Sequence, residues 1–355
     1  MTDLLALTAE LVAIPSVSHH ESALADRVEA ELRAVDHLEV LRLGDSVVAR
    51  TRLGRDRRVV LAGHLDTVPP FGDAGGRLEG DTVWGLGAVD MKGGLAVLLD
   101  LATTLSAPAL DVTYVLYACE EVAHEHNALA RLATTRPDLL AADAAVLGEP
   151  TAGVVEAGCQ GTIRAVVSTG GRRAHTARPW MGLNAVHRMA PVLGVLQCYV
   201  PRGVVIDGCE YTEQLQAVGI DGGVAANVVP DRAALTINYR FAPDADTASA
   251  QRTLRSLFDS VLDPSAGDAF DIVDAASGAP PALGHPVLGA LVAASGAPAR
   301  AKLGWTDVST FAAIGVPATN FGPGDPLLAH TSDEHVSRPE LERVRDVLAS
   351  VLLTG

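Results

Sequence analysis

The sequence predicts an α/β fold: a doubly wound, mostly parallel sheet forms one layered domain, and a smaller ferredoxin-like α+β domain is inserted into it. Short continuous apolar runs alternate with helical patterns in the first part of the chain. The middle part reads strand, helix, strand, strand, helix, strand, which is the ferredoxin-like order. The length of 355 residues exceeds what one core comfortably fills.

The first part of the chain begins with an amphipathic pattern that Pro15 ends. We read it as a helix and not as a signal peptide, because it carries acids early and has no basic leader. Apolar runs bounded by turn signals then predict buried strands at 58–63, 112–118 and 144–148. Helical patterns at 94–105 and about 123–135 lie between these strands.

The middle of the chain has a different pattern, and a Gly/Ala/Pro stretch at 278–281 ends it. The expected elements are a strand at 162–169, a helix at 183–197, strands at 211–220 and 232–241, a helix at 247–262 and a strand at 270–274. A helix at 287–294 and a strand at 317–321 then resume the first pattern. We therefore predict a discontinuous domain of residues 1–161 and 280–355, with an inserted domain of residues 162–279.

The net charge of −16 argues against a nucleic-acid partner, because the only block of basic residues is at 55–58. No apolar run approaches the roughly 18 residues of a membrane span. The four cysteines form no CxxC pair, which favours free thiols in a soluble, cytoplasmic protein. Because the chain is acidic, an anionic substrate could bind only where metals and a few arginines make the local electrostatic potential positive.

Carboxylate and imidazole side chains follow the predicted strands and one glycine-rich turn. The set is His64, Asp66, Asp90, Glu120, Glu121, Glu149 and His330. Each has a plainer interpretation when taken alone, such as a helix cap for Asp90 or an exposed loop for His330. Ligand sites of open α/β sheets gather at the carboxyl ends of strands, so the joint pattern predicts one shared edge. Mixed imidazole and carboxylate ligands suit zinc and tolerate cobalt or manganese.

Two of these positions have a more specific interpretation. A bridging carboxylate holds two metals roughly 3.5–4 Å apart, and Asp90 lies in a glycine-rich loop that could aim it at both. Asp66 could orient His64, since a metal-bound histidine usually passes its second N–H to a carboxylate.

Further candidates lie in the predicted inserted domain. His175 follows its first strand and could stabilise an oxyanion, although a surface basic loop explains the same residues. Asn227 could add a polar contact and Arg240 a carboxylate clamp.

Seven motifs carry a resemblance to a known family. They are GHLDTVP at 63–69, GLGAVDMKGG at 85–94, ACEEV at 118–122, GEPT at 148–151, EAGCQGT at 156–162, RAHTARPWMG at 173–182 and NFGPGDPLLAH at 320–330. Over nearly the whole chain, these motifs resemble the M20 metallopeptidase family. RAHTARPW and GPGDPLLAH are most similar to the members that convert N-succinyl-L,L-2,6-diaminopimelate to succinate and L,L-2,6-diaminopimelate.

The resemblance implies two Zn²⁺ per subunit, with Asp90 bridging them. The implied ligands are His64, Asp90 and Glu149 for one ion, and Asp90, Glu121 and His330 for the other. It also implies that Glu120 is the general base and acid, that Asp66 orients His64, and that the Asp90–Met91 peptide is cis. A homodimer through the inserted domain would bring His175 to the partner's scissile carbonyl.

The implied substrate is a small anionic N-acyl amino acid, and Asn227 and Arg240 would meet it. The chain departs from some members at Gln160, where they carry a basic residue. The candidates to bind the substrate carboxylates instead are Arg178, Arg240, Lys302 and the segment from Gly304 to Thr306. The alternatives are another M20 activity, such as an acetylornithine deacetylase or a dipeptidase, and a non-catalytic metal-stabilised binding protein, which would not need Glu120.

Overall fold

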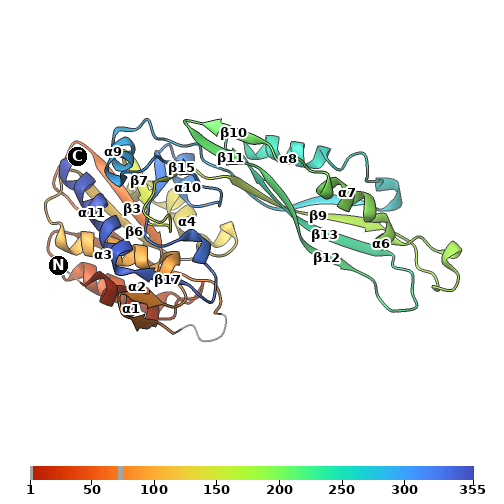
Figure 1. Ribbon diagram of the computed structural model, residues 1–355, viewed down its shortest axis with the longest axis horizontal. Helices are drawn as coiled ribbons and strands as arrows, with labels where there is room; N and C mark the ends of the chain where they lie inside the picture. The colour runs from red at the N-terminus through yellow and green to blue at the C-terminus, as the bar shows by residue number, and fades with distance from the viewer. Residues whose placement is uncertain (1–2, 71–74) are drawn as a thin grey trace.

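The computed structural model describes residues 3–70 and 75–355. Figure 1 shows a layered part that contains both chain ends and an elongated part that extends from one side of it. The layered part is built on an eight-stranded sheet. In sheet order, its strands are β1 (Glu39–Leu43), β2 (Ser46–Arg50), β6 (Asp111–Tyr117), β3 (Arg58–His64), β7 (Ala144–Leu147), β16 (Ala318–Asn320), β8 (Glu156–Ala157) and β15 (Arg300–Ala301).

The four central strands, β6, β3, β7 and β16, are mutually parallel, so their carboxyl ends meet at one edge of the sheet. Helices cover both faces. The first face carries α1 (Leu4–Ala13), α2 (Ser22–Arg33), α3 (Gly93–Thr104), α9 (Pro286–Ser295) and α11 (Arg338–Thr354), and the second carries α4 (Ala128–Thr135), α5 (Pro137–Leu140) and α10 (Val308–Ala313). The predicted α/β fold with a large, mostly parallel sheet is therefore confirmed.

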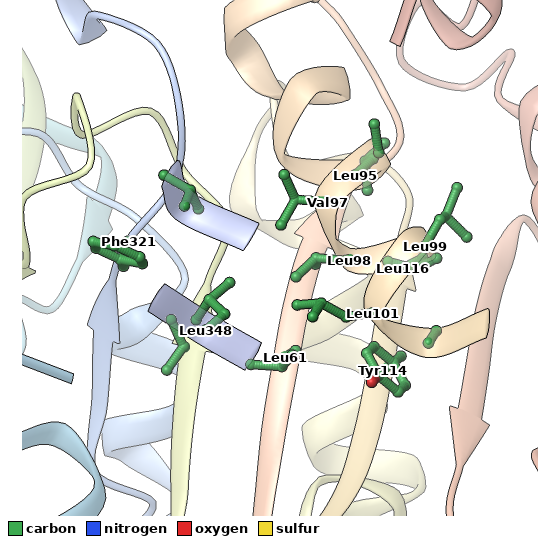
Figure 2. Packing of buried hydrophobic residues seen from close by; sticks show 14 of the residues in the cluster. Leu61, Leu95, Val97, Leu98, Leu99, Leu101, Tyr114, Leu116, Phe321 and Leu348 are labelled. Carbon is green, nitrogen blue, oxygen red and sulfur yellow. The ribbon is translucent and has the colours of Figure 1, made fainter. Parts of the chain in front are cut away.

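Strand β3 shows why its sequence is a continuous apolar run. Val59 and Leu61 pack into the first core, whereas Val60 and Ala62 pack into the second. A strand with helices on both faces has no solvent-exposed side, so its interior positions are apolar. Figure 2 shows Leu61 beside leucines of α3 and α11.

The elongated part is a four-stranded antiparallel sheet with helices on one face. Its order is β12 (Gln214–Gly222), β13 (Arg232–Phe241), β9 (Gly161–Gly170) and β14 (Ala269–Ala276), and its helices are α6 (Ala185–Arg188), α7 (Ala190–Gln197) and α8 (Thr247–Ser256). This is the ferredoxin-like arrangement that the sequence predicts. Along β9, Ile163 and Ala165 are buried in the core that the helices cover, so Thr162 and Arg164 lie on the opposite face.

Three predicted elements in this region are wrong in their bounds. The strand expected at 211–220 is two strands: β11 (Cys209–Thr212) pairs with β10 (Gly203–Ile206), and β12 follows after Glu213. Asp207 and Gly208 form the hairpin turn with φ of 47° and 81°, which is the conformation that an Asp-Gly pair favours. The helix expected at 183–197 is divided into α6 and α7, and the one expected at 247–262 ends at Ser256.

The helix expected at about 123–135 begins only at Ala128, where the Asn127 side chain accepts a hydrogen bond from the Ala130 N–H. A small sheet of β4 (Arg77–Glu79), β5 (Thr82–Trp84) and β17 (His335–Ser337) flanks the layered part. The remaining helical turns are η1 (Ala88–Lys92), η2 (His124–His126), η3 (Pro179–Met181), η4 (Pro264–Ala266) and η5 (Pro326–Leu328). All four cysteines are free. Within residues 3–70 and 75–355, no helix combines the length and apolar character needed to cross a membrane.

Candidate metal centre

Six of the predicted site residues converge at the carboxyl edge of the eight-stranded sheet. His64 ends β3, while Glu120 and Glu121 follow β6 after a short turn. Glu149 follows β7, and His330 lies in the loop after β16. Asp90 comes from η1, between β5 and α3, where the Asp90–Met91 peptide is cis. The parallel strands therefore deliver these side chains to one place from distant parts of the sequence.

The ligand atoms of these residues form three overlapping groups within which they all lie within 4.8 Å of one another. The groups are His64, Asp90 and Glu149; Asp90, Glu121 and His330; and His64, Glu120 and Glu121. The first two share Asp90, and they are the two ligand sets that the sequence motifs imply.

The Asp90 carboxylate lies between the two imidazoles. Its Oδ1 is 3.0 Å from Nε2 of His64, and its Oδ2 is 3.4 Å from Nε2 of His330. His330 Nε2 is also 2.7 Å from Oε1 of Glu121. A carboxylate that presents one oxygen to each side is arranged to bridge two cations.

Asp66 makes hydrogen bonds to three residues of the candidate centre, His64, Glu120 and Glu121. Nδ1 of His64 lies 2.9 Å from the Asp66 carbonyl oxygen and 3.6 Å from its carboxylate, so the hydrogen bond is to the backbone. The carboxylate instead accepts from the Ser18 hydroxyl at 2.8 Å and from the N–H groups of Glu120 and Glu121 at 2.9 and 3.0 Å. Asp66 thereby contacts His64 through its backbone carbonyl and accepts hydrogen bonds from the turn of the two glutamates through its side chain.

The electrostatics of the group favour bound cations. Burial raises the pKa of Glu120 well above its usual range, and burial together with the nearby Asp90 raises that of Glu149 to about 7. Burial also opposes ionisation of Asp90, but hydrogen bonds to His330 and His64 hold its pKa below the usual range. Oε1 of Glu149 is buried and has no hydrogen-bond partner among the described residues. A buried carboxylate oxygen without a partner is costly unless a cation binds it, so these residues fit a metal centre.

Sequence reasoning missed a residue that supports Asp90. Oε1 of the buried Glu334 accepts hydrogen bonds from the N–H groups of Val89 and Asp90 at 2.9 and 3.0 Å. The Glu334 carbonyl also accepts from the Gly85 N–H at 3.0 Å. The separation of 244 positions from Asp90 means that no local pattern could reveal this contact.

A second missed residue supports the turn before Glu120. Glu21 is buried, and its Oε1 accepts from the N–H groups of His19 and Cys119 at 3.0 and 3.1 Å. Cys119 has a φ of 61°, which is uncommon for a residue with a side chain. The hydrogen bond that the Glu21 carboxylate accepts from the Cys119 N–H stabilises this conformation and so helps to place Glu120.

A cleft of about 370 Å³ opens from this edge towards the four-stranded sheet. Glu120, Glu121 and His330 line it on one side, with Arg164 and Arg240 on the other. Arg240 donates from Nε to Oδ1 of Asn238 at 3.1 Å, and burial lowers the pKa of its guanidinium. Gly304 also lines the cleft, whereas Thr306 is buried and its hydroxyl donates to Oδ1 of Asn320 at 2.9 Å.

Three other predicted residues lie away from the centre within one chain. His175 and Arg178 are exposed in the loop that follows β9, and the Asn227 carbonyl accepts from the N–H of Thr176 in that loop at 3.1 Å. The ten residues of β9 span roughly 33 Å between this loop and the layered part. The loop therefore lies at the far end of the elongated part from the eight-stranded sheet (Figure 1).

The position that departs from the motif pattern is buried. Nε2 of Gln160 donates to the Thr212 carbonyl at 3.0 Å. Lys302 is one candidate to take the place of the basic residue that some members carry at position 160. Its Nζ lies 2.9 Å from Oε2 of Glu156, and both residues are buried. Neither Gln160 nor Lys302 lines the cleft.

Comparison with known proteins places this geometry in a family. The family model described as Peptidase family M20/M25/M40 matches residues 60–354. The chain belongs to this family. M20 members are metal-dependent hydrolases, and the carboxylate and imidazole groups described above are candidate metal ligands.

Two relatives match the M20 chain over nearly its full length. A Corynebacterium glutamicum protein named succinyl-diaminopimelate desuccinylase is 44% identical over 353 residues, which is 98% of this chain and 94% of the relative. A Mycobacterium tuberculosis protein that is provisionally assigned the same name is 52% identical over 351 residues, which is 99% of this chain and 98% of the relative. Among solved structures, a tripeptidase from Staphylococcus aureus matches with a TM-score of 0.82 at 18% identity, covering 99% of this chain and 97% of its own. This structural match shows the shared M20 fold.

Proposed function

We propose that this chain hydrolyses N-succinyl-L,L-2,6-diaminopimelate to succinate and L,L-2,6-diaminopimelate, a cytoplasmic step towards lysine and cell-wall precursors. The observation that carries the proposal is the 44% identity, over 98% of the chain, to the Corynebacterium glutamicum protein of that name. The geometry supports the chemistry, because Glu120, a carboxylate outside the two ligand sets that share Asp90, stands beside them in an open cleft.

Two Zn²⁺ would be held at the edge of the sheet, and Co²⁺ or Mn²⁺ could substitute. His64, Asp90 and Glu149 would hold one ion, and Asp90, Glu121 and His330 the other. When bound, such ions polarise an amide carbonyl and bring the pKa of a water to near neutrality. The partnerless Oε1 of Glu149 and the position of Asp90 between two imidazoles support this assignment.

Glu120 would move the proton. Its carboxylate takes a proton from the attacking water, and the hydroxyl that remains adds to the amide carbonyl. As the C–N bond breaks, Glu120 returns that proton to the leaving amine, so succinate and free L,L-2,6-diaminopimelate result. Burial raises the pKa of Glu120 towards the range in which a group can both accept and donate a proton.

The remaining roles require a second copy of the chain. Residues 162–279 would form the inserted domain through which a homodimer assembles, and strand β12 is a sheet edge that pairs only with β13 among the described strands. An exposed edge of this kind is suited to cover by a partner. His175 and Asn227 would then reach the partner's cleft, where His175 would stabilise the developing oxyanion.

A turnover assay tests the function with three substrates: N-succinyl-L,L-2,6-diaminopimelate, N-acetylornithine and a dipeptide. The proposal expects the first to be hydrolysed with the highest kcat/KM by the metal-loaded enzyme, and Glu120→Ala serves as the inactive control. Preferential hydrolysis of N-acetylornithine or of the dipeptide would assign the chain to another M20 activity. No hydrolysis of any of the three, in protein with full metal content, would favour a binding protein.

A further inference from the structure

Two opposite charges stand side by side on the sheet face that forms one wall of the cleft. Arg164 on β9 and Asp274 on β14 are direct partners across the antiparallel pair. Both line the cleft of about 370 Å³ that also contains Glu120 and His330. The helices of the elongated part cover the other face of this sheet, so the two side chains face the cleft.

The two side chains do not form a closed ion pair. Nη2 of Arg164 and Oδ2 of Asp274 are 4.0 Å apart, too far for a hydrogen bond, and the side chains are 49% and 35% exposed. Among the described residues neither side chain makes a hydrogen bond, so the guanidinium donors and the carboxylate acceptors are free for a ligand. An exposed pair of this kind adds little to stability, so folding alone does not explain two charges beside a hydrolytic site.

We propose that Arg164 and Asp274 together bind the free α-amino-acid end of the substrate, Arg164 its carboxylate and Asp274 its ammonium group. An α-amino acid carries both charges on one carbon, so a cation and an anion a few ångströms apart on one surface are its complement. A site for a carboxylate alone would be weakened by Asp274, since the two negative charges repel. The inference rests on the proposed function, because the diaminopimelate half of that substrate ends in such a zwitterion.

The other positions considered for a carboxylate contact near the centre leave this role to Arg164. Lys302 is paired with Glu156, and Gln160 is buried against the Thr212 carbonyl. Arg240, the other cation of the cleft, lies opposite Thr162 on β9 and thus diagonal to Arg164. Arg240 is therefore placed to meet a different carboxylate of the same molecule, while Arg164 supplies a second basic group to a cleft that neither Gln160 nor Lys302 lines.

Steady-state kinetics with three related substrates test the pair on the metal-loaded enzyme. They are N-succinyl-L,L-2,6-diaminopimelate, N-succinyl-L-2-aminopimelate, which lacks the distal ammonium, and Nα-succinyl-L-lysine, which lacks the distal carboxylate. Arg164→Gln should lower kcat/KM about 10- to 100-fold for the first two and leave succinyl-lysine within about twofold. Asp274→Asn should lower it for the first substrate and for succinyl-lysine, and leave succinyl-aminopimelate nearly unchanged.

Matched variants control for charge alone. Arg252→Gln removes an exposed arginine from α8, on the covered side of the same sheet, and Asp271→Asn removes an exposed acid from β14 outside the cleft. Both should behave as wild type with all three substrates. The proposal is overturned if Arg164→Gln lowers all three substrates alike or lowers none, because a structural role or no role would then explain the residue.

A binding measurement separates this inference from the proposed function. Calorimetry on the metal-loaded wild type and on Arg164→Gln compares L,L-2,6-diaminopimelate with L-lysine. The variant should bind diaminopimelate about tenfold or more weakly and bind lysine as the wild type does. If the wild type fails to hydrolyse succinyl-diaminopimelate but shows this binding pattern, the proposed function is wrong and the pair stands. If hydrolysis occurs and the variant binds both ligands as the wild type does, the pair is refuted and the function stands.

Discussion

Glu334 offers a direct test of how a buried carboxylate supports the candidate metal centre. Its Oε1 accepts hydrogen bonds from the N–H groups of Val89 and Asp90 at 2.9 and 3.0 Å, and the residue is 2% exposed. Glu334→Ala would leave both N–H donors without this acceptor. Because these donors belong to the segment that carries Asp90, the substitution should loosen that segment even in protein without metal.

The size of the effect follows from these contacts. A hydrogen bond to a charged acceptor contributes about 1.5–3 kcal/mol. Burial raises the pKa of the Glu334 carboxyl, so its buried charge has a cost that offsets part of this gain. We therefore take the low end for each of the two bonds and expect a loss of about 3 kcal/mol. The unfolding entropy is about 2.1 cal/mol/K per residue, so for a cooperative unit of about 240 residues, the size of the layered part, that loss lowers Tm by roughly 6 °C.

Scanning calorimetry on metal-free protein measures the change without any contribution from bound ions. Glu334→Gln is the matched control, since its amide oxygen can still accept both bonds, and its free energy of unfolding should lie within about 1 kcal/mol of the wild-type value. The other carboxylate oxygen, Oε2, has no hydrogen-bond partner among the described residues, so the amide nitrogen displaces no existing bond. If the alanine and glutamine variants lost the same stability, or if alanine lost none, the two hydrogen bonds would not be what supports this segment.

Three further predictions concern the centre itself. Glu120→Ala should lower kcat by about 10²–10⁴-fold while its metal content stays near that of the wild type, whereas Glu121→Ala should lose metal. Elemental analysis measures the metal content, and loss of metal from Glu120→Ala but not from Glu121→Ala would mean that Glu120 is the ligand and Glu121 the base. Burial raises the pKa of Glu149 to about 7, so its carboxyl holds a proton below that pH and cannot bind a cation well. The apparent metal affinity, measured by competition with a chelator, should therefore fall as the pH drops from about 8 to 6, and an affinity that does not change over this range would contradict the prediction. Glu120→Ala and His175→Ala should each be inactive, but a mixture of the two should recover up to about a quarter of wild-type activity, because half of the dimers are mixed and each mixed dimer has one complete site of two. No recovered activity after proven subunit exchange would mean that His175 serves its own subunit.

The residues of the candidate centre could be predicted from the sequence because each follows a local pattern. The apolar runs of β3, β6 and β7 identify strands buried on both faces, and a polar residue directly after such a run stands at the sheet edge. His64 and Glu149 could therefore be placed from a few neighbouring positions. The Asp207-Gly208 hairpin also had a local signal, and the error there was to extend one strand through it.

The tertiary structure alone decided which side chain meets which. The sequence predicted that Asp66 orients His64, but only the folded chain shows that the Asp66 carbonyl makes that contact and that its carboxylate holds the Glu120–Glu121 turn. The support of Asp90 by Glu334 and the position of Arg164 beside Asp274 join residues that are far apart in the chain. Local periodicity determines which elements form and which face of each is buried, since it depends on a few adjacent residues. The partner that a polar side chain meets depends on how distant elements pack, and that depends on the whole chain at once.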